Sequence, residues 1–152
     1  MKTVKNVFLA IILFGGSFVV LLFISQNVGV TSPLFPVQRL DESLIFLTKR
    51  SPEAKAEYYQ YLIQKRFSDI SYCIKTNHTN ILLSGSLRYS TTVGKAVQFV
   101  MAANSKKYQL KLELELQKKT FHDIILQYRS KDEGRKYIED DINYINIYEK
   151  DL

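Results

Sequence analysis

The sequence predicts an all-α protein in which a transmembrane helix near the start precedes an antiparallel bundle of about four to five helices. Three observations support this prediction. Residues 7–24 are apolar and uncharged, apolar residues recur at helical spacing through residues 39–152, and the one run that alternates like a strand has no second run to pair with. With 152 residues, the chain has room for about one domain besides this segment.

Residues 7–24 have the length and composition of a membrane anchor. Of these 18 residues, 15 are apolar and none is charged. A helix of that length spans about 27 Å, close to the ~30 Å hydrocarbon core of a bilayer. Lys2 and Lys5 precede the segment, and residues 25–38 contain no lysine or arginine. The positive-inside rule therefore predicts that residues 1–6 are cytoplasmic and that the rest of the chain is extracytoplasmic.

A cleaved signal peptide and a buried core helix are the alternatives for this segment. The apolar part of a signal peptide is usually about 7 to 15 residues long and ends in small residues, whereas here Asn27 stands two residues before Gly29. A core helix of a small soluble protein normally has a polar side, which this segment lacks. The sequence therefore favours a retained anchor.

Residues 25–38 are predicted to be a short linker to an extracytoplasmic helical domain at residues 39–152. Pro33 and Pro36 stiffen the linker, because each fixes its own φ and disfavours helix in the preceding residue. A first helix is expected at residues 39–49, where apolar residues recur at helical spacing.

A long helix is predicted to begin after Ser51. Ser51 can cap it, Pro52 fits its first position, and Glu53 faces the positive end of the helix dipole. The residues expected on its buried face are Tyr59, Ile63, Phe67, Ile70 and Ile74.

Residues 81–103 are predicted to form the next helix, after a polar break at residues 76–79. Gly85 and Gly94 each lower helix propensity by about 1 kcal/mol relative to alanine, so a bend near residues 90–92 remains open. The residues expected in its core stripe are Leu83, Leu87, Val93, Val97 and Val100.

The leucines that alternate between residues 110 and 116 are predicted to be helical, because a lone strand cannot satisfy its backbone groups. A helix is expected at residues 106–130, a turn at residues 131–134 and a last helix around residues 137–148. The first of these helices should place Leu112 and Leu116 away from its core face, which comprises Leu110, Leu114, Phe121, Ile125 and Tyr128.

No residue is predicted to be catalytic, to bind a cofactor or to ligate a metal. His78 and His122 lack the carboxylate and imidazole neighbours that zinc or iron requires in a bundle. Neither a nucleophile elbow nor a glycine-rich phosphate loop occurs. Cys73 is expected to be a core residue. The acidic run Glu139-Asp140-Asp141 is expected on a solvated helix surface.

Charge is distributed unevenly along the chain. Residues 39–131 contain 16 basic and 8 acidic residues, and residues 132–152 contain 3 basic and 7 acidic residues. The two parts can compensate each other, and the basic part can also attract phosphate, anionic lipid headgroups or an acidic envelope polymer. The basic residues are dispersed and form no recognition motif, so nucleic acid is not an expected partner.

Aromatic residues are a further candidate for surface contacts. The chain has 10 tyrosines, all from Tyr58 on. Tyr58, Tyr59 and Tyr61 must face different sides of one helix, so at least one should lie at the surface.

Two stretches resemble the opening of an uncharacterised bacterial domain-of-unknown-function family, whose pattern is similar to Pro-Leu-Tyr-Pro-Leu-Lys-Arg and then Ser-Pro-Glu-x-Lys-Ala-Glu. Here they are residues 32–40 and 51–59, with Phe35 and Gln38 in place of the usual Tyr and Lys. Residues 121–125 also look like a later helix of that family. The resemblance implies a membrane-tethered helical domain outside the cytoplasm with no established catalytic residues.

The sequence as a whole predicts a membrane-anchored extracytoplasmic interaction or scaffold protein of the bacterial cell envelope, and not an enzyme. Its expected partners are the lipid bilayer, through residues 7–24, and an envelope protein or a second copy of the chain. The alternatives are a ligand-sensing outer domain that signals through a membrane partner and a pilin-like surface filament subunit.

Overall fold

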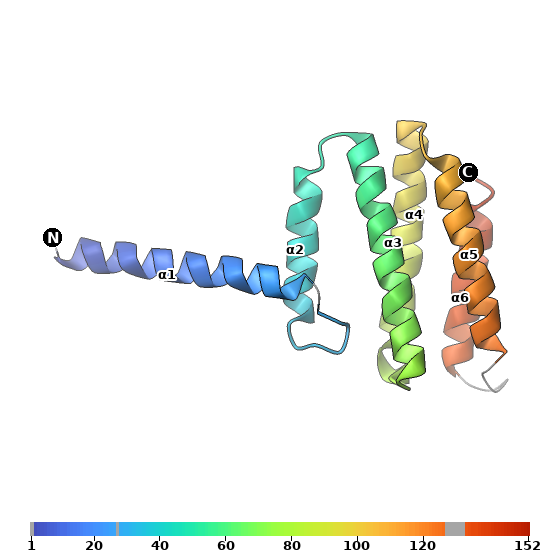
Figure 1. The fold of residues 1–152 in the computed structure, drawn as a ribbon, viewed down its shortest axis with the longest axis horizontal. Coiled ribbons are helices and arrows are strands. Elements are labelled where there is room, and N and C mark those ends of the chain that lie inside the picture. The colour runs from blue at the N-terminus through green and yellow to red at the C-terminus, as the bar shows by residue number, and fades with distance from the viewer. Residues whose placement is uncertain (1, 27, 127–132) are drawn as a thin grey trace. The chain divides into compact units, whose positions relative to one another are not determined.

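Helices make up all the regular secondary structure in the residues that the structure, a computed structural model, describes: 2–26, 28–126 and 133–152, with side chains from residue 12 on. This confirms the all-α class. Two units divide the chain, Met1–Thr48 and Lys49–Leu152. The helices are α1 (Lys2–Ser25), α2 (Phe35–Thr48), α3 (Pro52–Lys75), the short 3-10 helix η1 (Thr79–Ile81), α4 (Leu82–Ala103), α5 (Lys107–Ile125) and α6 (Glu133–Tyr148) (Figure 1).

In the first unit, α2 begins earlier than the sequence predicted. Residues 35–38, expected in the linker, form its first turn. Pro36 is tolerated there because the first helical positions need no N–H donor. Gln38 is buried, and its side-chain amide donates to the backbone carbonyl of Val28 at 2.9 Å. This contact holds the start of α2 against the turn that follows α1.

The predicted anchor coincides with most of α1. Residues 7–11 lie outside the residues with described side chains, and residues 12–24 lie within them. Among the described residues, we find no helix whose apolar run is long enough to cross a membrane.

The second unit is a bundle of α3, α4, α5 and α6 (Figure 1). The helix α3 begins as predicted, with the Ser51 side chain accepting a hydrogen bond from the Ala54 N–H at 3.1 Å. It packs along α4, while α6 packs against both α4 and α5. Phe121 of α5 lies at the centre of the bundle, 5.0 Å from the Phe67 ring of α3 and 5.4 Å from the Tyr89 ring of α4 (centroid to centroid).

The helix α4 is continuous, so the bend left open near residues 90–92 is not present. The Thr91 and Thr92 hydroxyls donate to carbonyls of the preceding turn, at 2.7 and 2.6 Å, which is compatible with an unbroken helix. Val93, Val97 and Val100 are buried as predicted.

The predicted core stripe of α4 is wrong in its first half, because Leu83 and Leu87 are exposed. Small residues occupy the interior positions instead. A Cβ on Gly85 would lie 3.4 Å from Ile70 of α3, and the Ser86 hydroxyl donates to the Tyr137 carbonyl of α6 at 3.3 Å. The close approach of these neighbouring helices turns the leucines outward.

The helix α5 confirms the helical interpretation of the alternating leucines. Its buried residues include Leu110, Leu114, Phe121 and Ile125, as predicted. Tyr128 and the rest of the segment predicted to extend to residue 130 lie outside the described residues. The predicted turn at residues 131–134 is wrong for its last two residues, which begin α6. An acidic residue at position 133 suits the positive end of the helix dipole.

Candidate functional site

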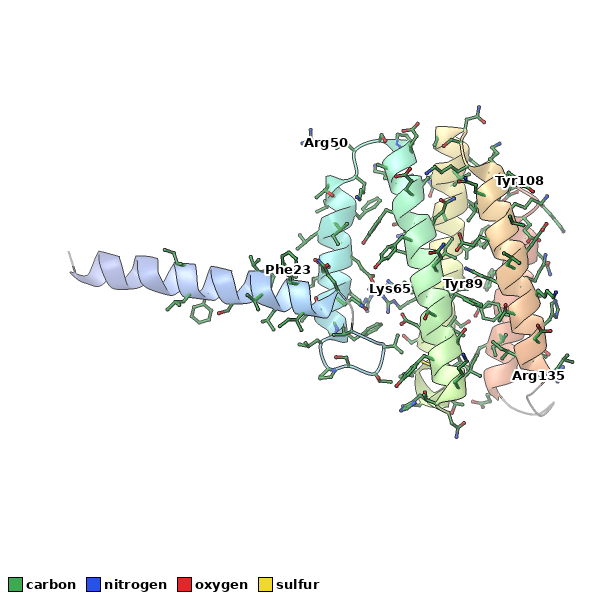
Figure 2. The ribbon with its side chains drawn as sticks, in the orientation of Figure 1. Phe23, Arg50, Lys65, Tyr89, Tyr108 and Arg135 are labelled. Atoms are coloured by element: carbon green, nitrogen blue, oxygen red, sulfur yellow. The ribbon has the colours of Figure 1, made fainter. Side chains whose placement is uncertain are left out.

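The described part of α1 exposes large apolar side chains on every side. Nine of them are between 41 % and 80 % exposed, and Phe23 illustrates the arrangement in Figure 2. Successive helical residues advance by about 100°, so these positions surround the helix axis. A helix that is apolar all round normally lies within protein or lipid. The nine residues are Ile12, Leu13, Phe14, Phe18, Val19, Val20, Leu21, Phe23 and Ile24.

A second apolar surface runs along the outer face of α5. Tyr108, Leu112 and Leu116 are 78 %, 45 % and 60 % exposed, and their spacing of four residues places them on one side of the helix. Tyr108 projects from the start of α5 in Figure 2. We call these three residues the α5 stripe. Contiguous exposed apolar residues of this kind are typical of protein contact surfaces.

Lysine side chains lie over aromatic rings on α3 and α4. The Lys49, Lys55 and Lys95 ammonium groups are 5.9, 5.5 and 5.8 Å from the ring centroids of Tyr58, Phe99 and Tyr59, respectively. The Tyr59 and Phe99 rings stack at 5.4 Å and join the two helices. We call these six residues the lysine–aromatic cluster. In each pair the ammonium group lies over a ring face, which attracts cations electrostatically.

One of the adjacent tyrosines lies at the surface, as predicted. Tyr61 is 53 % exposed, whereas Tyr58 and Tyr59 are buried. Tyr61 stacks on Tyr58 with ring centroids 6.4 Å apart. The aromatic surface of the cluster therefore extends to solvent along α3.

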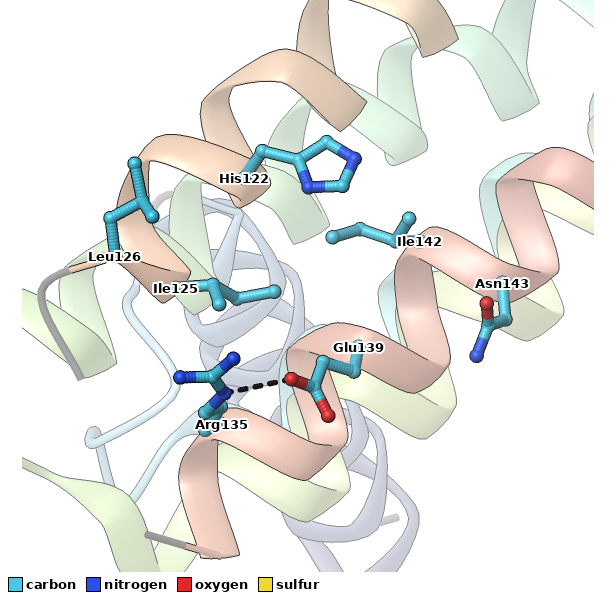
Figure 3. Close-up of a pocket in the computed structure, with 7 residues that line it drawn as sticks. All are labelled: His122, Ile125, Leu126, Arg135, Glu139, Ile142 and Asn143. Atoms are coloured by element: carbon cyan, nitrogen blue, oxygen red, sulfur yellow. Dashed lines mark hydrogen bonds and ion pairs between the residues drawn. The ribbon is translucent and has the colours of Figure 1, made fainter. Parts of the chain in front are cut away.

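A groove of about 530 Å³ lies between the end of α5 and residues 135–143 of α6 (Figure 3). The Arg135 Nε donates to Glu139 Oε1 at 2.7 Å across one side of it. His122 and Asn143 supply further polar groups, and Ile125, Leu126 and Ile142 supply apolar ones. Such a lining suits a small molecule with both an apolar and a charged part.

The two histidines and the cysteine have different surroundings. His78 bonds to the Thr76 hydroxyl (Nδ1 to Oγ1, 2.7 Å) and stacks on Tyr72, while His122 lines the groove. Cys73 is buried, as predicted, and burial raises the pKa of its thiol. Within residues 2–26, 28–126 and 133–152, no group of three or more His, Cys, Asp or Glu side chains could hold a metal ion.

A buried polar chain crosses the bundle from α4 to α5. The Tyr89 hydroxyl, which lies inside the bundle (Figure 2), donates to Gln117 Oε1 at 2.6 Å. The Gln117 amide in turn donates to Glu113 Oε1 at 3.0 Å. Burial is the main cause that raises the pKa of the Glu113 carboxyl. Sequence patterns did not reveal these hydrogen bonds, because Tyr89 lies 28 residues before Gln117 and on another helix.

The expectation that the acidic run of α6 is solvated is wrong for Asp141, which is fully buried. Three consecutive helical residues point about 100° apart, so they cannot all face water on a packed helix. Asp141 follows Ile138 by three residues and precedes Ile145 by four, which places it in the apolar stripe. That spacing is the feature of the sequence that could have predicted the burial of Asp141.

The Asp141 carboxyl has few compensating interactions. Neither of its oxygens accepts a hydrogen bond of ordinary geometry. The pKa of this carboxyl is raised to about 8: burial is the largest cause, the nearby Ser86 hydroxyl lowers the pKa, and the charge of Asp140 raises it. Asp141 therefore carries its proton at neutral pH.

No protein-family model, curated protein or solved structure matches this chain. The family resemblance of residues 32–40 and 51–59 stays a prediction.

Proposed function

We propose that this chain is a membrane-anchored extracytoplasmic interaction or scaffold protein of the bacterial cell envelope. The observation that supports this proposal best is the set of nine exposed apolar side chains that surround α1. Water is a poor solvent for such a surface, whereas a bilayer core accepts it, and a helix satisfies its own backbone hydrogen bonds there. The uncharged sequence of residues 7–24 supports the same location.

The proposed orientation follows from charge. Lys2 and Lys5 remain in the cytoplasm, and the helical domain lies outside. The family resemblance implies the same arrangement. In that position the domain can contact neighbouring envelope proteins through the α5 stripe, and phosphate groups of lipids or polymers through the lysine–aromatic cluster.

The anchor can be tested with Phe14→Lys/Phe18→Lys in the full chain. Each lysine at the centre of a membrane helix costs about 2.5–3.5 kcal/mol of insertion free energy, so the double variant should leave the membrane fraction after an alkaline wash, and the wild type should stay. Protease added outside should digest the bundle of the wild type in intact spheroplasts. Leu112→Lys/Leu116→Lys is the matched control, and it should stay with the membrane. Release of the wild type, or retention of Phe14→Lys/Phe18→Lys, would contradict the anchor.

The contact role of the α5 stripe can be tested by photocrosslinking in living cells. A photoreactive residue at position 112 or 116 of the full chain should yield one discrete adduct, with an envelope protein or with a second copy. The same residue in place of Lys136, which is exposed on α6, should not yield that adduct. Equal adducts from all three positions would show that the stripe is not a specific contact.

The α5/α6 groove favours ligand sensing as a second candidate function. Its volume of about 530 Å³ lies within the range of small-molecule sites, and Arg135 and Glu139 offer opposite charges. Thermal unfolding of the full chain with anionic and aromatic metabolites or wall fragments provides the test. A ligand at 100 times its Kd should stabilise the wild type by about 2.7 kcal/mol and should stabilise Arg135→Gln less. If no compound stabilises the wild type, the groove has no sensing role.

A further inference from the structure

The inner face of α6 combines aliphatic packing with one ionisable group. Its buried residues are Gly134, three isoleucines and Asp141. Asp141 and Ile138 are fully buried, so α6 cannot separate from its neighbours without hydrating the carboxyl and an apolar side chain together. The stability of the α6 contact therefore depends on the state of that carboxyl.

Burial and the charge of Asp140 favour the neutral form of Asp141, whereas the Ser86 hydroxyl favours the ionised form. From α4, Ser86 and Tyr89 face it, but their hydroxyls donate to the Tyr137 carbonyl and to Gln117. On α6 itself, the neighbouring charge is Asp140. No ion pair of Asp141 occurs among the described residues.

Two further acids lie near the buried Tyr89 phenol that Asp141 also affects. Burial is the largest cause that raises the pKa of the Tyr89 phenol. The charges of Asp141, of Glu113 on α5 and of Glu149 beyond the end of α6 raise it as well. Lys118 of α5 is paired with Glu149. An ionised Asp141 would thus be a third acid in a low-dielectric interior, without a cation of its own.

We propose that Asp141 makes the packing of α6 conditional on protonation, so that α6 stays on α4 and α5 while the carboxyl is neutral and is released when it ionises. Release exposes Ile138, Ile142 and Ile145, which then form an apolar surface that the closed bundle conceals. The bundle thereby has two states that differ by one proton.

The direction of the pH dependence follows from the two pKa values of this carboxyl. In the closed bundle the value is about 8, and in a released, hydrated helix it returns to the ordinary value of 3.8. The preference for the closed state is therefore complete below about pH 4 and declines as the pH rises to about 8. Over that interval, each pH unit favours the open state by about tenfold, because opening releases one proton. Above about pH 8 the opening equilibrium no longer changes with pH.

Hydrogen exchange of the full chain between pH 5 and 9 tests the proposal. Protection factors, which correct for the intrinsic pH dependence of exchange, should fall for α6 by about tenfold per pH unit up to pH 8. At each pH they should be lower for α6 than for α3, because α3 stays packed when α6 is released. Asp141→Asn should abolish most of the decline in α6. Asp140→Asn removes a charge from the adjacent exposed position and should leave the decline in place.

Three outcomes would overturn the proposal. The first is an equal decline in wild type and Asp141→Asn, and the second is an effect of Asp140→Asn as large as that of Asp141→Asn. The third is protection of α6 equal to that of α3 at every pH, which would mean that the whole bundle opens at once. If Asp141→Asn does not fold, Asp141→Leu removes the ionisable group without an amide to bury, and the same outcomes apply.

Discussion

At the scale of single residues, the two glycines of α4 lie in unlike surroundings. A Cβ on Gly85 would meet Ile70 at 3.4 Å, an ordinary contact. A Cβ on Gly94 would lie 2.6 Å from the hydroxyl oxygen of Tyr148 and 2.9 Å from its ring. The ring of Tyr148 is also stacked on Tyr144, with centroids 6.5 Å apart, so it must move to admit the extra atom.

We expect opposite effects from alanine at these two positions. Gly85→Ala should stabilise the fold by about 0.4–1 kcal/mol, because alanine restricts the unfolded chain and fits the helix. Gly94→Ala should destabilise it by about 1–3 kcal/mol through overpacking against Tyr148. Urea unfolding of both variants measures the free energies. A Tyr148→Ala background should remove the penalty of Gly94→Ala, and equal stabilities of the two single variants would contradict the predicted contact.

Residue-level features were the hardest to predict from the sequence. Periodicity assigned Leu83 and Leu87 to the core, but Gly85 and Ser86 permit closer helix contacts and displace them. Composition assigned Asp141 to the surface, since acids are rarely buried. In both cases the outcome depends on which neighbouring helix approaches which side. That information lies in tertiary packing rather than in local sequence.

At the scale of helices, α5 presents two faces of similar composition and different environment. Leu110 and Leu114 are fully buried, whereas Leu112 and Leu116, which are part of the α5 stripe, are exposed to solvent. The sequence separated these faces correctly, because helical geometry alone places residues two positions apart on different sides. The helix α5 thus packs one face into the core and exposes apolar residues on another face.

The same substitution on the two faces should therefore give different results. Leu114→Ala should reduce the free energy of unfolding by about 2–5 kcal/mol, because it leaves a cavity in the core. Leu116→Ala, its matched control two residues away, should change it by less than about 0.5 kcal/mol. Thermal or urea unfolding of the full chain in detergent compares them. A loss of more than 2 kcal/mol in Leu116→Ala would show that the stripe is covered.

Helix positions were predictable where local signals are strong. Ser51 and Pro52 marked the start of α3, and the caps are as predicted. The start of α2 was missed, because it depends on the contact of Gln38 with the backbone near Val28, ten residues away. The lysine–aromatic cluster was missed for a similar reason, since α3 and α4 each contribute to it.

At the scale of the whole molecule, the main property is the net positive charge and the contacts that its lysines make. The chain has a formal net charge of +6. Part of this charge is compensated internally, as in the pairs Lys106–Glu57 and Lys118–Glu149. The lysines of the cluster also lie over aromatic rings, whose faces attract cations. We therefore expect the cluster to attract a polyanion.

We expect the full chain in neutral-lipid nanodiscs to bind inorganic polyphosphate, and the affinity to fall as salt rises, because exposed charges are screened within about 10 Å at 0.1 M salt. Lys55→Glu/Lys95→Glu should reduce the affinity at low salt by at least tenfold, since it both removes cations and introduces repulsion. Lys75→Glu/Lys119→Glu makes the same change in net charge at exposed positions away from the cluster and should have a smaller effect.

Nanodiscs with anionic lipid should weaken polyphosphate binding if headgroups occupy the cluster, and should leave it unchanged if the natural anion is a soluble polymer. Equal losses in the two double variants would mean that only net charge matters, and the cluster would then have no specific role.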